Sequence, residues 1–395
     1  RPAPNYHAGY MFAATLIEID MVSEAVADAT RQWKHVWGTI YSTDMAAAMV
    51  GGVLEGGDWG EGWQYAPLSV AEYALAARAM ADHGLDVEPY TAWLRSVLVR
   101  HVYALTPDTE QLFIGGDTQE ESANIPANDM TLNGVIAGPS TPEVKSWAAA
   151  EIERLGLSGK NGFALFEVLA EVEGAKPVPF PRADAPTSYV AQGTGTLYAR
   201  SSWASSAVWF VSHCVATAKM DVDHAPPNAG NFVLTRGHDD LIIDPTPYGS
   251  LSSLTTNAPT VENGQFPEHY KPSQSLWSVD TRFHWSRQTT SGIIAARCDY
   301  ADQYKFQQRP SDVPLALRDW VVVPYAEGAD AMTVVIDRAR SGNAKRPLHL
   351  RFRTPVKLTL AKDTARGTLG ESALTIQQLA ASGGQAEVRS IAAGS

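Results

Sequence analysis

The stretch 228-NAGNFVLTRGHDDLIIDPTPYGS-250 decides the fold class of the second half of this chain. Within it, 231-NFVLTRGHDDLIID-244 consists of two apolar runs on either side of Gly237 and His238. A short glycine-containing connection between two such runs is typical of a β-hairpin. Consecutive strands joined in this way run antiparallel. We therefore expect an antiparallel sheet around this hairpin.

The same pattern continues on both sides of the hairpin. Short apolar segments recur about every 10 residues with no helical period between them, which is typical of an antiparallel β-sandwich rather than a parallel sheet. The other predicted strands are 196–203, 207–216, 293–300, 318–325, 332–339 and 348–354.

Upstream of these strands the hydrophobic period changes to that of helices. Apolar residues recur there at three- and four-residue spacing. Gly84, Pro107 and the Thr141–Pro142 pair supply signals that end or begin helices. The sequence therefore predicts a string of helical hairpins, with helices over 10–29, 68–84, 88–105, 142–156 and 162–172.

A proline-rich segment separates the two patterns. The stretch 174-GAKPVPFPRADAPT-187 has four prolines and no hydrophobic period, as linkers do. A chain of 395 residues is also long for a single core. We predict an α+β multidomain protein with a helical domain over 1–175, a linker over 176–187 and a β-sandwich over 188–395. The last 20 or so residues are rich in Ala, Gly and Ser, and we expect them to be poorly ordered.

Composition and charge exclude several classes of function. The chain is 45% apolar and 19% charged, as globular proteins are. Its net charge of −12 argues against nucleic-acid binding, but a small basic groove can still hold a polyanionic sugar.

No apolar run reaches the length of about 18 residues that a membrane span needs. The chain starts at Arg1 without a secretion signal, so we expect a leader or a longer N-terminal stretch to be missing.

Cys214 and Cys298 are the only cysteines. Both lie in strand-like apolar runs, which favours buried free thiols. A single disulfide is the alternative in an oxidising compartment, because two cysteines alone do not establish one.

Three polar or aromatic stretches stand out as candidate sites: 4-PNYHAGY-10, 58-DWGEGWQYAPLSVAEY-73 and 221-DVDHAPPNAGNF-232. Each also has a structural interpretation: a capped helix start, a packed loop before a helix and a surface turn. The chain has no Walker loop, GxGxxG, HExxH, CxxC or GxSxG motif, which argues against the chemistry those motifs carry.

These three stretches, in this order, resemble the heparinase II/III-like polysaccharide lyases, a group that includes alginate lyases. The likeness extends to 228–250 and to the pair 318-RDWVVVP-324 and 332-MTVVIDR-338, and it covers most of residues 1–340. It implies an (α/α) toroid of helical hairpins, here incomplete because the first helices are lacking, followed by an antiparallel β-sandwich. It also implies a bacterial protein that is periplasmic or secreted.

The resemblance implies three catalytic residues, His7, Tyr65 and His224. In such lyases a tyrosine and a histidine cleave a uronate-containing polysaccharide by β-elimination: one removes the C5 proton and one protonates the oxygen that leaves C4. A phenol donates a proton readily at neutral pH, whereas a tyrosine that acts as a base needs cationic or hydrogen-bonding neighbours. His7, Arg236 and Arg282 are candidates for that role.

A second group of residues is expected to bind the substrate. An asparagine or histidine neutralises the uronate carboxylate in such lyases, usually as an Asn directly before the His, whereas here Tyr6 separates Asn5 from His7. Arg282 belongs to 282-RFHWSR-287, which either binds an anionic sugar or is an ordinary strand. Asn128 either lines a sugar cleft or caps a helix. The full set is Asn5, Glu61, Trp63, Asn128, Asn228, Arg236, Tyr248 and Arg282.

The zinc site that many such lyases carry is expected to be absent. Pro226 stands where the first histidine ligand would be, and 255-TTNAPTV-261 has no histidine for the last one. Asp244 is retained, but a closed zinc site needs about four ligands and Asn257 is a poor substitute. We therefore expect no metal and no cofactor, with Tyr248 and Asn228 helping to hold the loop.

Two other functions remain open. Asp58, Glu61, Glu120 and Glu121 include enough carboxylates for a glycoside hydrolase pair, although solvated loop acids are the simpler interpretation. A catalytically silent glycan-binding protein is the third possibility, since 225-APP-227 differs from the polar pattern of the lyases. The leading hypothesis is a carbon–oxygen lyase. The sequence leaves open the uronate polymer, endo or exo action, and the oligomeric state.

Overall fold

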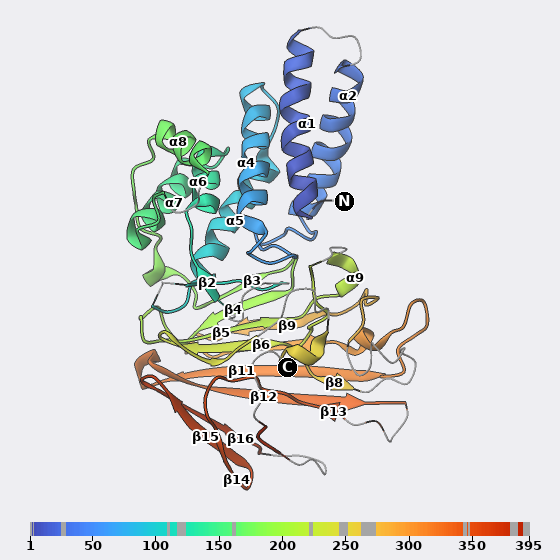
Figure 1. Ribbon diagram of the computed structural model, residues 1–395, viewed down its shortest axis with the longest axis vertical. Helices are drawn as coiled ribbons and strands as arrows, with labels where there is room; N and C mark the ends of the chain where they lie inside the picture. Colours follow the sequence, from blue (N-terminus) through green and yellow to red (C-terminus); the bar gives the residue numbers. More distant parts are fainter. Residues whose placement is uncertain are drawn as a thin grey trace.

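The protein combines helices with antiparallel sheets. Figure 1 shows the long helices on one side of the molecule and the sheets on the other. None of the helices in the parts described is long and apolar enough to cross a membrane. The computed structural model describes residues 2, 4–24, 29–108, 111–116, 124–159, 163–220, 224–244, 252–261, 274–342, 346, 348–379 and 386–389.

The five predicted helices are all present. Those that the sequence missed are short or lack a polar face: every residue of Met130–Ala137 is buried, so no helical period stands out there. The α-helices are α1 (Asn5–Ser23), α2 (Ala29–His35), α3 (Ala46–Met49), α4 (Ala66–Asp82), α5 (Glu88–Ala104), α6 (Met130–Ala137), α7 (Pro142–Leu155), α8 (Ala164–Glu173) and α9 (Thr217–Met220), and a π-helix spans Val36–Met45.

The start signal of α7 acts as the sequence predicts. The Thr141 hydroxyl accepts a hydrogen bond from the Val144 amide at 3.4 Å, and Pro142 occupies the first turn, where its missing amide costs nothing. Gly156 ends the helix with φ 58°, a left-handed conformation that glycine adopts without strain.

Two larger sheets dominate the second half of the chain. The five-stranded sheet has the order β3 (Ser188–Ala191), β4 (Thr196–Arg200), β5 (Val208–His213), β6 (Phe232–Arg236) and β7 (Asp239–Ile242). The four-stranded sheet has the order β12 (Asp330–Arg340), β11 (Leu315–Tyr325), β10 (Ile294–Asp299) and β9 (Arg282–Gln288). All pairs are antiparallel, and Gly237 and His238 form the predicted turn between β6 and β7.

Smaller antiparallel pairs complete the described strands. The predicted strand at 348–354 is reduced to two residues, and the strands between 359 and 377 were not predicted. These elements are β1 (Gln111–Phe113) with β2 (Asn124–Pro126), β8 (Thr260–Val261) with β13 (Leu348–His349), and β14 (Thr359–Ala361) with β15 (Thr364–Leu369) and β16 (Ser372–Gln377). Within the final 20 residues only 376–379 and 386–389 are described, so the expectation about that end lies largely outside the described residues.

The five-stranded sheet lies between the helices and the four-stranded sheet (Figure 1). Side chains alternate between the two faces of a strand. Along β5, Trp209 and Val211 therefore join the core shared with the helices, while Phe210 faces the other sheet and packs 6.2 Å from the Trp320 ring. One strand thus contributes to both cores and fixes the sheet against the helices.

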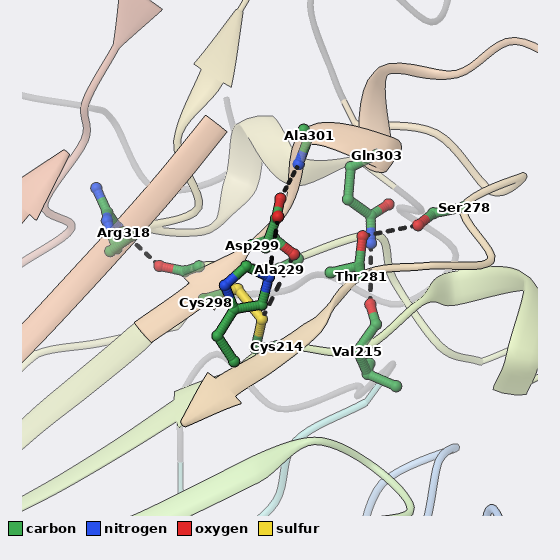
Figure 2. The surroundings of a disulfide bond; sticks show 12 residues. Cys214, Val215, Ala229, Ser278, Thr281, Cys298, Asp299, Ala301, Gln303 and Arg318 are labelled. Carbon is green, nitrogen blue, oxygen red and sulfur yellow. Dashed lines mark hydrogen bonds and ion pairs between the residues drawn. A yellow bond between two sulfur atoms is a disulfide. The ribbon is translucent and has the colours of Figure 1, made fainter. Parts of the chain in front are cut away.

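A disulfide joins the two sheets, which corrects the expectation of free thiols. Cys214 follows β5, Cys298 lies in β10, and their Cα atoms are 5.6 Å apart (Figure 2). Both residues are buried, as expected. The preference for thiols was wrong because the sequence does not reveal that these two positions, 84 residues apart, face each other. Nearby, Gln303 Nε2 donates to the Val215 carbonyl at 2.9 Å and holds the same chain segment.

Candidate functional site

Tyr65 and His224 meet where the helices contact the five-stranded sheet. Their rings stack with centroids 4.3 Å apart and an interplanar angle of 17°. Tyr65 is the residue directly before α4, and His224 follows α9 in the connection to β6. Both side chains are half-buried, so each ring has one face packed and part of its surface open to solvent.

A close approach of two loops positions Tyr65. Gly62 and Gly116 pack backbone against backbone: a Cβ added to Gly62 would lie 2.3 Å from the Gly115 carbonyl oxygen, and one added to Gly116 would lie 2.1 Å from that of Glu61. Both glycines also have positive φ, 87° and 64°. Only glycine fits these positions, and the loop can therefore lie flat against the β1 region.

Asp58 anchors the same loop from inside the protein. Its carboxylate contacts Arg100 Nε at 2.9 Å and accepts hydrogen bonds from Trp63 Nε1 and Thr194 Oγ1, both at 2.7 Å. Burial alone would raise the pKa of Asp58, but Arg100 and these donors outweigh it and hold the pKa below its ordinary value. Asp58 is therefore ionised, which disfavours it as the acid of a glycoside hydrolase.

Glu61 joins the loop to the start of α1. Its carboxylate accepts from the Asn5 amide at 2.7 Å and from Trp59 Nε1 at 3.2 Å, and the side chain is only 2% exposed. The interpretation of Asp58 and Glu61 as solvated loop acids was wrong, because both carboxylates are buried among donors. Glu120 and Glu121 lie outside the described residues.

His7 lies on the first turns of α1, opposite α4. Its Nδ1 atom shares a hydrogen bond with the Tyr73 hydroxyl at 2.8 Å, and its ring packs edge-on against the Tyr73 ring. Burial lowers the pKa of His7 to about 4, so the imidazole is neutral at pH 7. The hydrogen bond of the His7 side chain thus goes to Tyr73 rather than to Tyr65 or His224.

The other expected substrate-binding residues differ in their surroundings. Trp63 is buried under the Arg100 guanidinium, 3.9 Å from its ring centroid. Asn128 lies one residue before Asp129, the N-cap of α6, and accepts from the amide of Met130, the first helical residue, at 3.1 Å. Arg236 pairs with Asp330 at 2.8 Å, and Arg282, at the start of the strand β9, pairs with Asp280. Asn228 is buried beside His224 in the chain, and Tyr248 lies outside the described residues.

Asparagines surround Asp244, where the resemblance would place a zinc ion. Asn231 Nδ2 donates to Asp244 at 2.5 Å, and Asn231 Oδ1 accepts from the Asn257 amide at 2.9 Å. The Asn257 side chain donates to the carbonyls of Phe232 and Ile243 at 2.8 and 2.7 Å. The Asn257 oxygen, the atom that could bind a metal, already accepts from the Arg353 amide at 2.5 Å, and Pro226 has no ligating atom, so these residues do not fit a zinc ion.

His213, the last residue of β5, was not among the site residues predicted from the sequence. Its Nδ1 atom lies 3.3 Å from Thr196 Oγ1, and burial lowers the pKa of His213 to about 4. With Asp58, Trp63 and Arg100, it lines a small cavity that Pro226 and Asn228 close from the side of His224. A histidine inside the predicted strand 207–216 gives no sequence signal of its own.

Comparisons with known proteins identify the fold. No family model and no curated protein sequence matches the chain. The heparan sulfate lyase HepC from Pedobacter heparinus has a similar structure, with a TM-score of 0.59, 14% identity, and coverage of 97% of this chain and 53% of that one. Two heparinase III structures give TM-scores of 0.58 and 0.54 at 12% and 13% identity; each match covers 93% of this chain, and 50% and 52% of theirs. The chain thus spans about half the length of these lyases and shares their fold distantly.

Proposed function

We propose that this protein is a polysaccharide lyase that cleaves a uronate-containing glycan by β-elimination, with Tyr65 and His224 as its acid and base. The stack of these two rings carries the proposal. Both residue types transfer protons, and they meet at a half-buried junction. The distant likeness to heparinase III and to a heparan sulfate lyase supports the same reaction class.

The chemistry divides between proton transfer and charge neutralisation. One of Tyr65 and His224 removes the C5 proton, and the other protonates the oxygen that leaves C4. Tyr65 lies at the N-terminus of α4, whose dipole favours negative charge nearby. In the tautomer of neutral His7 in which Nδ1 accepts from Tyr73, the Nε2 atom keeps its proton and donates it to the uronate carboxylate as a hydrogen bond. Asn5, on the same turn of α1, is the second candidate for that role.

The expected domain architecture and cellular location fit this proposal. The helices α1 to α8 would form an incomplete (α/α) toroid over 1–175, and the sheets a β-sandwich over 188–395. The Cys214–Cys298 disulfide suits an oxidising compartment, such as the periplasm or the exterior, where polymeric glycans are met. The proposed reaction assigns no step to a metal, and the hydrogen bonds of Asn231 with Asp244 and with the Asn257 amide support that choice.

The test is a screen on uronate polymers. Alginate, heparan, hyaluronan and polygalacturonate are each incubated with the protein, and the ultraviolet absorbance of the 4,5-unsaturated product is followed. We expect one polymer class to give the chromophore, and both Tyr65→Phe and His224→Ala to abolish it. New reducing ends without the chromophore would instead indicate a hydrolase. Activity that survives both substitutions contradicts the assignment of the two residues.

A further inference from the structure

A small cavity lies next to the proposed catalytic pair. Its walls include Trp63, two positions before Tyr65, and Ala225, directly after His224, so the cavity and the stacked rings share both chain segments. It measures about 40 Å³, on a scale where one water molecule needs roughly 10–15 Å³. The cavity therefore has room for a few groups the size of a hydroxyl.

Two of the residues that line this cavity carry a buried nitrogen without a hydrogen-bond partner among the residues that the structure describes. Arg100 Nη1 has none, although Nε contacts Asp58 and Nη2 donates to the Phe113 carbonyl at 3.0 Å. His213 Nε2 also has none. More than nine in ten buried polar groups are paired, so two unpaired ones around one cavity need an explanation.

A chain of hydrogen bonds fixes which nitrogen of His213 carries the proton. The ionised Asp58 only accepts, so Thr194 donates to it. The single hydroxyl proton of Thr194 is then used, and the hydroxyl proton of Thr196 points either to Thr194 across their 2.8 Å contact or to Asp58. Thr196 in turn has only acceptor capacity left for His213 Nδ1. His213 is therefore protonated at Nδ1, and its Nε2 atom is a lone-pair acceptor.

The two unpaired nitrogens require a ligand that both donates and accepts. Arg100 Nη1 needs an acceptor and His213 Nε2 needs a donor. A carboxylate or a sulfate ester offers acceptors alone and would face the lone pair of Nε2. A sugar hydroxyl offers both. Asn228, which also lines the cavity and whose side chain makes no hydrogen bond with the described residues, adds a donor and an acceptor.

We propose that this cavity is a subsite for a free hydroxyl group of a sugar unit, which donates to His213 Nε2 and accepts from Arg100 Nη1. The subsite rests on the proposed function, since the sugar is a unit of the uronate polymer held beside Tyr65 and His224. It selects units whose entering hydroxyl is unmodified over units that carry an O-sulfate there. Both nitrogens are shielded from water by the surrounding side chains, so the hydroxyl reaches them only after a small displacement of the cavity wall, for which the unbranched side chain of Met220 is suited.

The test measures binding in a Tyr65→Phe background, which keeps the stacked ring and removes the hydroxyl needed for turnover. Hexasaccharides of alginate, heparosan and unsulfated chondroitin are titrated by calorimetry, each beside its O-sulfated form. His213→Asn keeps a donor at the Nδ1 position and deletes the acceptor, whereas His213→Gln places an amide oxygen near Nε2. The control is His101→Asn, since His101 also has ring nitrogens without a hydrogen-bond partner among the described residues but is more deeply buried than His213 and does not line the cavity.

We expect one unsulfated hexasaccharide to bind, His213→Asn to weaken it about 10-fold, and His213→Gln to restore part of the loss. His101→Asn leaves the affinity unchanged. Three results would overturn the subsite. His213→Asn could bind as tightly as its parent, or no hexasaccharide could bind. The O-sulfated form could also bind as tightly as the unsulfated one, which would mean that the cavity holds water only. Binding that depends on His213 without any turnover by the unsubstituted protein overturns the lyase and leaves the subsite standing.

Discussion

The rings of Tyr65 and His224 lie 4.3 Å apart and nearly parallel, although one belongs to the start of a helix and the other to a connection in the sheet region. This contact depends on the docking of the helices onto the five-stranded sheet, because neither segment alone holds both residues. Any change that loosens this docking is expected to reduce activity together with stability.

The buried ion pair between Asp58 and Arg100 lies in the helical part and contacts the five-stranded sheet, because Thr194 donates to Asp58 and Arg100 donates to the Tyr198 hydroxyl. Asp58→Asn keeps the shape but leaves a fully buried guanidinium without its carboxylate, and we expect it to lower the free energy of unfolding by about 3–5 kcal/mol. Asp82→Asn, which removes an exposed partner of Arg78, is the control and is expected to change it by less than about 0.5 kcal/mol. Urea denaturation of both variants checks this, and similar midpoints for the two contradict it.

The disulfide between Cys214 and Cys298 is expected to stabilise the two sheets against each other. It closes a loop of 84 residues, and removing a native disulfide of this kind costs about 2–5 kcal/mol. The double variant Cys214→Ala, Cys298→Ala should therefore unfold at a lower denaturant concentration. A reducing agent should shift the parent to the same midpoint and leave the double variant unaffected. A parent that is insensitive to reduction would show that the bond makes no contribution.

Stability should fall as the pH drops from 7 towards 4. Burial lowers the pKa of His101 to about 4, below its ordinary value of 6.5, so between these values the unfolded chain binds more protons than the folded protein. The contribution is fully present above about pH 6.5 and reaches about 3 kcal/mol at most for one histidine. His7 and His213 act in the same direction.

Urea midpoints measured across this pH range test the effect. His101→Asn should flatten the dependence, and the control His35→Asn, which changes an exposed side chain, should keep it. A midpoint that stays constant between pH 7 and 4 contradicts the burial of neutral histidines.

A chelator should leave the protein unaffected, because hydrogen bonds rather than a metal organise the segment around Asp244. We expect the melting temperature and the activity to be the same with and without EDTA. Asn257→Ala, in contrast, leaves the Phe232 and Ile243 carbonyls unpaired and should cost about 1–3 kcal/mol. A melting temperature that falls on chelation, with metal found in the protein, would falsify this prediction.

Local sequence patterns predicted much of the fold. The hairpin at Gly237, the helix start at Thr141 and the long strands β11 and β12 all follow from short-range signals. The helix α6 was not predicted because it is buried on every side. The disulfide was not predicted because no local pattern shows which strands face each other. The boundaries at 175 and 188 remain predictions.

In the candidate site, too, local sequence patterns indicated some residues and missed those whose contacts form only on folding. Tyr65 and His224 were chosen from their loops and lie together, whereas the roles given to them stay predictions. His213 was missed because its significance comes from the partners that folding brings to it: Thr196 on the neighbouring strand, and Asp58 and Arg100 from the helical part. Arg236 and Arg282, considered as neighbours of Tyr65, pair instead with Asp330 and Asp280.

The most direct measurement compares the turnover of Tyr65→Phe with that of the parent on the uronate polymer that gives the unsaturated product. Tyr65→Phe keeps the ring stacked on His224 and removes only the hydroxyl, so the account predicts a fall in kcat of about 10²–10⁴-fold at an unchanged melting temperature. Tyr325→Phe, an exposed tyrosine on β11, is the control and should keep full activity. A Tyr65→Phe variant that retains kcat within a factor of two or so contradicts the central claim.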